Sequence, residues 1–165
     1  MKELVEIEAQ LDRIAGLLRE EPDATVLRVE SVSSWSVAEQ LDHLLKILEA
    51  ALGRLARAPQ PVDRGINLVG RLLLACGRLP RGIGKSPEKL RGEQRERNEL
   101  AAQVDAVRAL LRGLGAEAEI WRDRRPIVRH GYFGGLTALQ AARFLAIHTD
   151  HHLRIVADIR RASGR

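Results

Sequence analysis

The feature that most constrains the fold is helical periodicity in four long segments. In each segment apolar residues recur every three or four positions, the spacing that places them on one face of an α-helix. The segments run over 2–19, from Ser36 to a stop near Pro59, over 93–114 and over 137–162. No alternating pattern of comparable strength predicts β-strands. The sequence therefore predicts an all-α fold, a four-helix bundle, with residues 1–165 forming one domain.

The predicted starts of the second and fourth helices carry capping signals. Ser36 is followed three residues later by Glu39, and Thr137 by Gln140, so both starts match the capping-box pattern. Trp35 directly precedes the first of these boxes. We expect Trp35 to pack against the start of its helix and not to contact a substrate.

The connection between the second and third long helices is the least regular part of the chain. Residues 66–76 are compatible with a short apolar helix, whereas LPRGIGKSPEKLRG at 79–92 reads as an irregular connection. A monomer seldom exposes an apolar run such as INLVGRLLLACG, so this segment favours a homodimer. The single Cys76 has no partner for an internal disulfide, and its apolar neighbours predict that it is buried.

Composition narrows the classes of function. The chain has a net charge of +5 and an isoelectric point near 10.1, which raises the question of nucleic-acid binding. Its basic residues are spread along the chain and only 3% of residues are aromatic, so nucleic acid is an unfavoured partner. No stretch is long and apolar enough to span a membrane, and the N-terminal residues lack a secretory signal pattern. A cytoplasmic location is expected.

Two of the five histidines occupy the middle of an apolar stripe. His148 and His152 are four residues apart, so both rings lie on the face of the fourth helix that is predicted to be buried. Burying two imidazoles costs free energy unless their nitrogens find partners. A shared metal ion would supply one, and hydrogen bonds within the core are the alternative. His151 lies at the edge of the same stripe.

His43 is the only other histidine within a predicted helix. On a helical wheel it lies roughly 140° from the centre of the apolar stripe of its helix, so periodicity alone places it at the flank or on the surface. It reaches the interior only if the helix packs a second face, through Gln40, His43, Ile47 and Ala51, against the fourth helix.

Two strings that contain these histidines resemble a known family. WSVAEQLDHLLKI at 35–47 and HGYFGGLTALQAARFLAIHTDHHLRIVADI at 130–159 are similar to the second and fourth helices of the DinB-like superfamily. The second string is closest to a branch of unknown function, and LPRGIGKSPEKL shows a weaker similarity to the middle connection of that branch. Together the matches cover the chain from its second helix to its last.

The resemblance implies a metal site and a range of activities. It implies that His43, His148 and His152 bind one divalent ion, zinc, nickel or iron, with open coordination positions. It leaves three roles open for His151: a hydrogen-bond donor to a ligand, a base that acts through a water, or a replacement ligand if the register is off by one. It assigns no catalytic residue and no role to His130. Relatives include S-transferases that use a low-molecular-weight thiol, isomerases and hydrolases. The resemblance thus implies a metal-dependent transferase or hydrolase with a small-molecule substrate. A non-catalytic metal-binding or stress-response module is the alternative.

Overall fold

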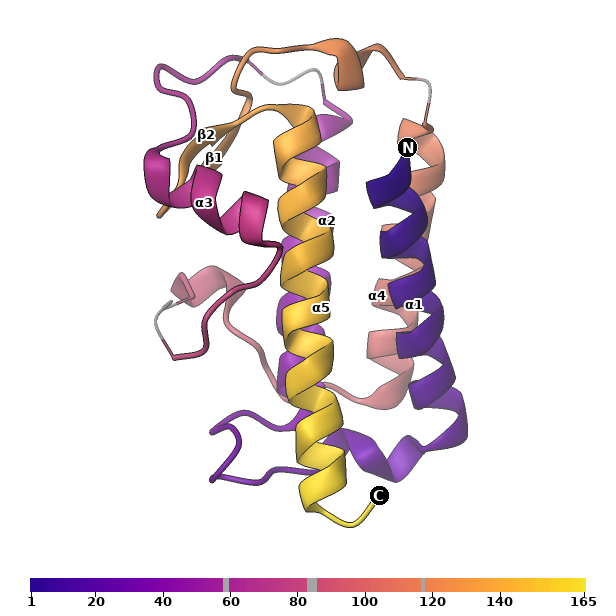
Figure 1. Ribbon diagram of the computed structural model, residues 1–165. Helices are drawn as coiled ribbons and strands as arrows, with labels where there is room; N and C mark the ends of the chain where they lie inside the picture. The colour runs from indigo at the N-terminus through magenta and orange to yellow at the C-terminus, as the bar shows by residue number, and fades with distance from the viewer. Residues whose placement is uncertain (58–59, 83–85, 117) are drawn as a thin grey trace.

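The computed structural model describes residues 1–57, 60–82, 86–116 and 118–165, and within them the chain is mostly helical. Four long helices run side by side: α1 (Lys2–Glu20), α2 (Val37–Leu55), α4 (Arg97–Leu114) and α5 (Ala138–Ala162) (Figure 1). The remaining elements are the short helix α3 (Leu68–Cys76), three 3-10 turns, η1 (Pro22–Val26), η2 (Glu88–Leu90) and η3 (Glu119–Arg122), and the strands β1 (Val128–His130) and β2 (Gly134–Leu136).

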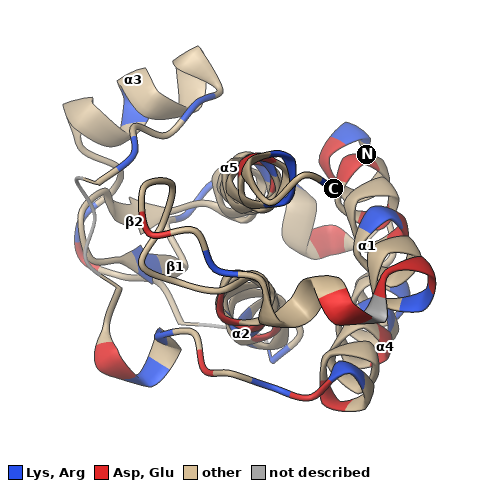
Figure 2. Ribbon diagram, turned by 90° about the horizontal axis from the view of Figure 1, so that it is seen from below, with Lys and Arg blue, Asp and Glu red and all other residues tan. Residues whose placement is uncertain are grey.

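The four long helices form a ring in which each contacts two others. Both α1 and α2 pack against α4 and against α5, and Figure 2 shows this arrangement nearly end-on. Their apolar stripes meet inside the ring, where Leu11, Leu44, Leu100 and Leu145 are among the fully buried side chains. Since α2 borders both α4 and α5, it buries two faces rather than one.

The helix starts follow the capping signals. Ser36 Oγ accepts a hydrogen bond from the Glu39 backbone N–H, and Thr137 Oγ1 accepts one from Gln140, as the sequence predicts. The third long helix begins at Arg97, later than expected. Its capping box is formed by Glu96 and Glu99, a pair that sequence analysis did not consider. The stop signal at Pro59 lies outside the described residues, and α2 ends at Leu55.

A small β-hairpin is the element that periodicity missed. β1 and β2 pair antiparallel, with Val128 opposite Leu136 and His130 opposite Gly134. Each strand has only three residues, and the second begins with two glycines, too short a pattern for an alternation to be visible. The hairpin leads directly into α5 and is joined to the segment before α3 by the bond from the Asn67 N–H to the Phe133 carbonyl oxygen (2.8 Å).

The short apolar helix that the sequence allowed does form, as α3, and it lies outside the ring of long helices (Figure 2). Its outer face exposes Leu68, Val69 and Leu72. The expectation that Cys76 is buried is wrong: it ends this peripheral helix and is exposed. In the connection that follows, residues 83–85 lie outside the described part of the chain. None of the described helices is long and apolar enough to cross a membrane.

Candidate metal centre

Three histidines from two helices converge between α2 and α5. His43 comes from α2, and His148 and His152 come from successive turns of α5. One ring nitrogen from each lies within 4.8 Å of the other two. Nitrogen ligands about 2.1 Å from a tetrahedral ion are roughly 3.4 Å apart, so small side-chain rotations bring the three nitrogens to ligand distance. The three residues therefore fit a divalent ion.

The burial of His43 corrects the reading from its helical wheel. His43 is only 5% exposed, so the flank or surface position predicted by the main stripe is wrong. The alternative, that this helix buries a second face, is confirmed. α2 packs a second face against α5, on which Gln40 is buried and Ile47 and Ala51 are partly buried.

Hydrogen bonds fix the tautomers of two of the three rings. His43 Nδ1 lies 2.5 Å from the carbonyl oxygen of Leu90, and His152 Nδ1 lies 2.5 Å from Gln40 Oε1. Carbonyl oxygens only accept hydrogen bonds, so each Nδ1 carries the proton and donates it. The Nε2 atom of each ring is then left with a lone pair, as in a metal-ligating histidine whose other ring nitrogen donates to a carbonyl oxygen.

Gln40 is itself oriented by a further contact. Its side-chain N–H donates to Ser33 Oγ (2.9 Å), and Ser33 Oγ also accepts the backbone N–H of Trp35 (3.0 Å). This directs Oε1 of the amide towards His152. Sequence reasoning did not identify Gln40 as a partner of a ligand, although its position three residues before His43 on the same helix was visible.

His148 has ring neighbours but no hydrogen-bond partner among the described residues. Its ring centroid lies 5.1 Å from that of His43, 4.5 Å from that of His152 and 5.3 Å from that of Phe144. Burial, reinforced by the neighbouring imidazoles, lowers the pKa of His148 and of His152 well below the usual value. At neutral pH the rings are uncharged, the only form that binds a metal. An unpartnered, partly buried imidazole costs free energy that a bound ion would offset.

The segment from Leu90 to Arg95, which we term the strap, carries the carbonyl that orients His43. Asp42, which is fully buried, accepts the backbone N–H of Glu93 (2.8 Å), the side-chain amide of Gln103 (3.0 Å) and the ammonium of Lys46 (2.7 Å). Burial alone would raise the pKa of Asp42, but these donors outweigh it and the pKa is lowered. Asp42 therefore stays ionised and ties the strap to α2.

Gly92 allows the strap to lie directly on α2. A Cβ at this position would stand 1.9 Å from the carbonyl oxygen of Glu39, a backbone atom that cannot turn away. The strap also accepts a hydrogen bond from the start of α2, donated by Ser36 Oγ to Gln94 Oε1 (2.6 Å). Leu90 therefore owes its place beside His43 to a close backbone contact, which the sequence did not reveal because Gly92 reads as a loop glycine.

The remaining histidines surround the triad without joining it. His151 Nδ1 donates to the carbonyl oxygen of Leu79 (3.2 Å), and its ring meets that of His152 edge-on. His130 Nδ1 accepts the backbone N–H groups of Tyr132 and Phe133 (3.2 Å each), which places it at the hairpin turn, and burial lowers its pKa to about 4. Asp150, between His148 and His152 in the sequence, pairs with Arg154.

Trp35 also belongs to the surroundings of the triad. It is half-buried and lies just before the start of α2. Its ring centroid lies 5.2 Å from that of His43, in an edge-on arrangement. Trp35 thus limits how far the His43 ring can rotate.

We predict that Gln40→Leu weakens metal binding about 10- to 100-fold, because it removes the acceptor for the His152 Nδ1 proton. Gln40→Glu is the matched variant, since it keeps an oxygen at the same place and the Ser33 hydroxyl can turn to donate to it. Zinc affinity measured by competition with a chelator should therefore be close to wild type in Gln40→Glu. Equal losses in the two variants would show that Gln40 contributes only to packing.

One comparison with known proteins matches most of the chain. The family model described as the DinB superfamily matches residues 6–156, a span that includes α2, most of α5 and all three histidines of the triad. No match was found among curated proteins or among solved structures. A match over this much of the chain, in the order in which the helices occur, establishes the family. The chain belongs to the DinB superfamily.

Proposed function

We propose that this protein is a four-helix bundle of one domain that binds one divalent metal ion through Nε2 of His43 and His152 and one ring nitrogen of His148. The observation that carries the proposal is the pair of hydrogen bonds that His43 Nδ1–H and His152 Nδ1–H donate to Leu90 and Gln40. These bonds leave a lone pair on Nε2 of each ring, which can bind a metal ion. Three imidazoles suit zinc, nickel and iron alike.

The activity that such a site supports best is that of a metal-dependent transferase of the thiol S-transferase type, or of a hydrolase, acting on a small molecule. A divalent ion held by three neutral imidazoles supplies an open position at which water or a low-molecular-weight thiol becomes acidic. The residues of this chain keep the ligands neutral by burial and hold their orientation through Leu90, Gln40 and Trp35. We propose that His151, whose ring meets that of His152 edge-on, orients a ligand and does not replace one.

The burial of the triad favours a second candidate, a metal-binding module without turnover. His43 and His152 are 5% and 8% exposed, so the site is largely covered as the structure stands. The two functions differ in whether a small molecule reaches the ion. Cobalt-substituted protein separates them, because an added thiol changes the visible spectrum only if it binds the metal.

Metal analysis of protein purified without a histidine tag tests the proposal. We expect about one zinc, nickel or iron per chain, removal of this metal by a chelator, and saturable rebinding of one equivalent. A spectral change of the cobalt protein on adding a thiol supports the transferase, and no change supports the module. A chain that neither retains nor rebinds a stoichiometric divalent ion contradicts both.

We also propose that the exposed face of α3 forms part of a homodimer interface. Leu68 is 72% exposed, Val69 58% and Leu72 57%, so an apolar patch lies on an element outside the ring of helices. Light scattering should report a dimer, and Leu68→Glu with Leu72→Glu should shift it to a monomer. Val5→Glu, on the exposed face of α1, is the control. A wild-type monomer at every accessible concentration would exclude this interface.

A further inference from the structure

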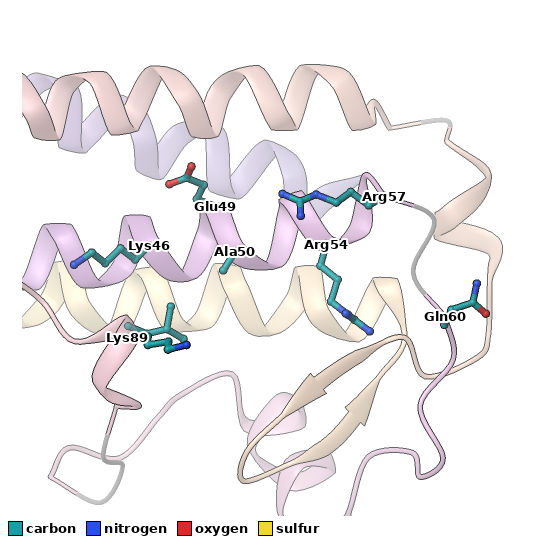
Figure 3. Close-up of a pocket in the computed structure, with 8 residues that line it drawn as sticks. Lys46, Glu49, Ala50, Arg54, Arg57, Gln60 and Lys89 are labelled. Carbon is teal, nitrogen blue, oxygen red and sulfur yellow. The ribbon is translucent and has the colours of Figure 1, made fainter.

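A groove with a basic lining follows α2 beyond the metal centre. It has a volume of about 730 Å³ and is lined by Lys46, Glu49, Ala50, Arg54 and Arg57 of α2, by Gln60, and by Lys89 and Leu90 of η2 (Figure 3). Four of these side chains are cationic and one is a carboxylate. The volume is within the range of about 300–1,000 Å³ that is typical of small-molecule sites.

Most of the cationic side chains in the groove form no ion pair with a carboxylate among the described residues. Lys46 is paired with Asp42 (2.7 Å) and Glu93 (3.3 Å). Among the described residues, Arg54, Arg57 and Lys89 form no ion pair. These three cations outnumber the one carboxylate of the groove, Glu49, so the groove has an excess of positive charge. Because the surface is concave, an anion bound there is close to several cations at once.

Arg54 is held in place before any ligand binds. Its Nε donates to the carbonyl oxygen of Ile127 (2.9 Å), next to the hairpin, and Figure 3 shows the side chain directed that way. The remaining N–H groups of the guanidinium are thus presented from a fixed position. A guanidinium that is already ordered loses less conformational entropy when it binds an anionic oxygen.

The groove lies on the same side of α2 as His43. At 100° per residue, His43, Ala50 and Arg54 fall within about 40° of one another, and Arg54 lies roughly 16 Å further along the helix axis than His43. Leu90 belongs to both places, because it lines the groove and its carbonyl oxygen orients His43. The strap therefore separates the metal centre from the basic groove.

We propose that this groove binds a small molecule with two or more negative charges, carried by phosphate or carboxylate groups, with Arg54, Arg57 and Lys89 as its partners. A small anion fits better than a nucleic acid, because the cations are gathered in one short groove beside α2. The proposal does not depend on the metal, since no ligand of the ion lines the groove.

Isothermal titration calorimetry of the metal-free protein with pyrophosphate and with citrate, at constant ionic strength, tests the groove. We expect saturable binding of one anion per chain. Arg57→Gln with Lys89→Gln should weaken it roughly tenfold or more. Arg13→Gln with Arg112→Gln removes the same charge from exposed positions on α1 and α4 and should leave the affinity within about twofold. Arg54 is kept, because its contact with Ile127 is structural.

The outcomes separate the possibilities. Tighter binding of pyrophosphate identifies phosphate groups as the ligand chemistry, and tighter binding of citrate identifies carboxylates; either supports the groove. No saturable binding up to about 10 mM, or equal weakening in both double variants, overturns it. So does single-stranded RNA that binds more tightly than either anion with steep salt dependence. Zinc stoichiometry in the Arg57→Gln, Lys89→Gln protein should be unchanged, so this test and that of the metal centre fail independently.

Discussion

His43→Ala, His148→Ala and His152→Ala should each lower metal affinity by at least about 100-fold, more than is lost when a ligating histidine loses its hydrogen-bond acceptor. The reason is common to the three: each removal leaves two nitrogens where three converge within 4.8 Å. His151→Ala is the matched control on α5, because its Nδ1 already donates to Leu79, and its affinity should stay within about tenfold of wild type. Zinc competition titrations measure all four proteins.

Acid should release the metal from the wild-type protein. Burial lowers the pKa of all three rings, so they remain neutral at pH 7 and bind without first losing a proton. Without metal, a histidine whose folded pKa lies below its unfolded value of about 6.5 adds stability above that value and loses it as the pH falls. We therefore expect the metal-free protein to lose stability below about pH 6.5.

The histidine variants also have outcomes that would contradict the site. Undiminished metal binding in His43→Ala would contradict it. Strong loss of metal in His151→Ala with little loss in His152→Ala would show that the pair on α5 is His148 and His151.

Gly92→Ala should destabilise the fold by about 3 kcal/mol or more, because the added methyl group would overlap the Glu39 carbonyl oxygen and force the strap away from α2. The same displacement moves the Leu90 carbonyl from His43 Nδ1, so metal affinity should fall as well. Urea denaturation of the metal-free protein gives the first effect, and zinc titration the second.

Gly113→Ala is the control for this variant. Gly113 lies inside α4, and a Cβ there meets no atom within 4 Å. Because Gly113 is the last residue but one of α4, alanine should stabilise the helix by at most about 0.5–1 kcal/mol, the gain over glycine in a helix interior. If Gly92→Ala is as stable as Gly113→Ala, the strap does not rest on α2 as described.

The long helices and the α5 part of the site were predictable because they depend on local pattern. Apolar spacing located the four segments, Ser36 and Thr137 marked two starts, and the spacing of His148 and His152 put both on one face. His43 was harder, since a helix wheel shows one dominant stripe and cannot tell which second face a neighbour will cover. The family resemblance, and not periodicity, brought His43 into the triad.

The parts that were missed depend on contacts between distant segments. Gln40 is important because it accepts a hydrogen bond from His152, and Gly92 is important because it lies against the backbone of Glu39. Neither contact can be predicted from the sequence of the segment in which each residue lies. The hairpin escaped because three-residue strands carry too little alternation. Cys76 was misplaced because an apolar neighbourhood in sequence was taken for one in space.

The pairing of Gln40 with His152 joins residues 112 positions apart, which has a consequence for synthesis of the protein. A nascent chain that ends before α5 contains His43 but neither of the two histidines that complete the triad. Such a chain carries only one of the three ring nitrogens that converge in the folded structure. Binding of an ion at this site would require α5 to be synthesised and docked, so such an ion would stabilise chains that contain α5 over chains that lack it.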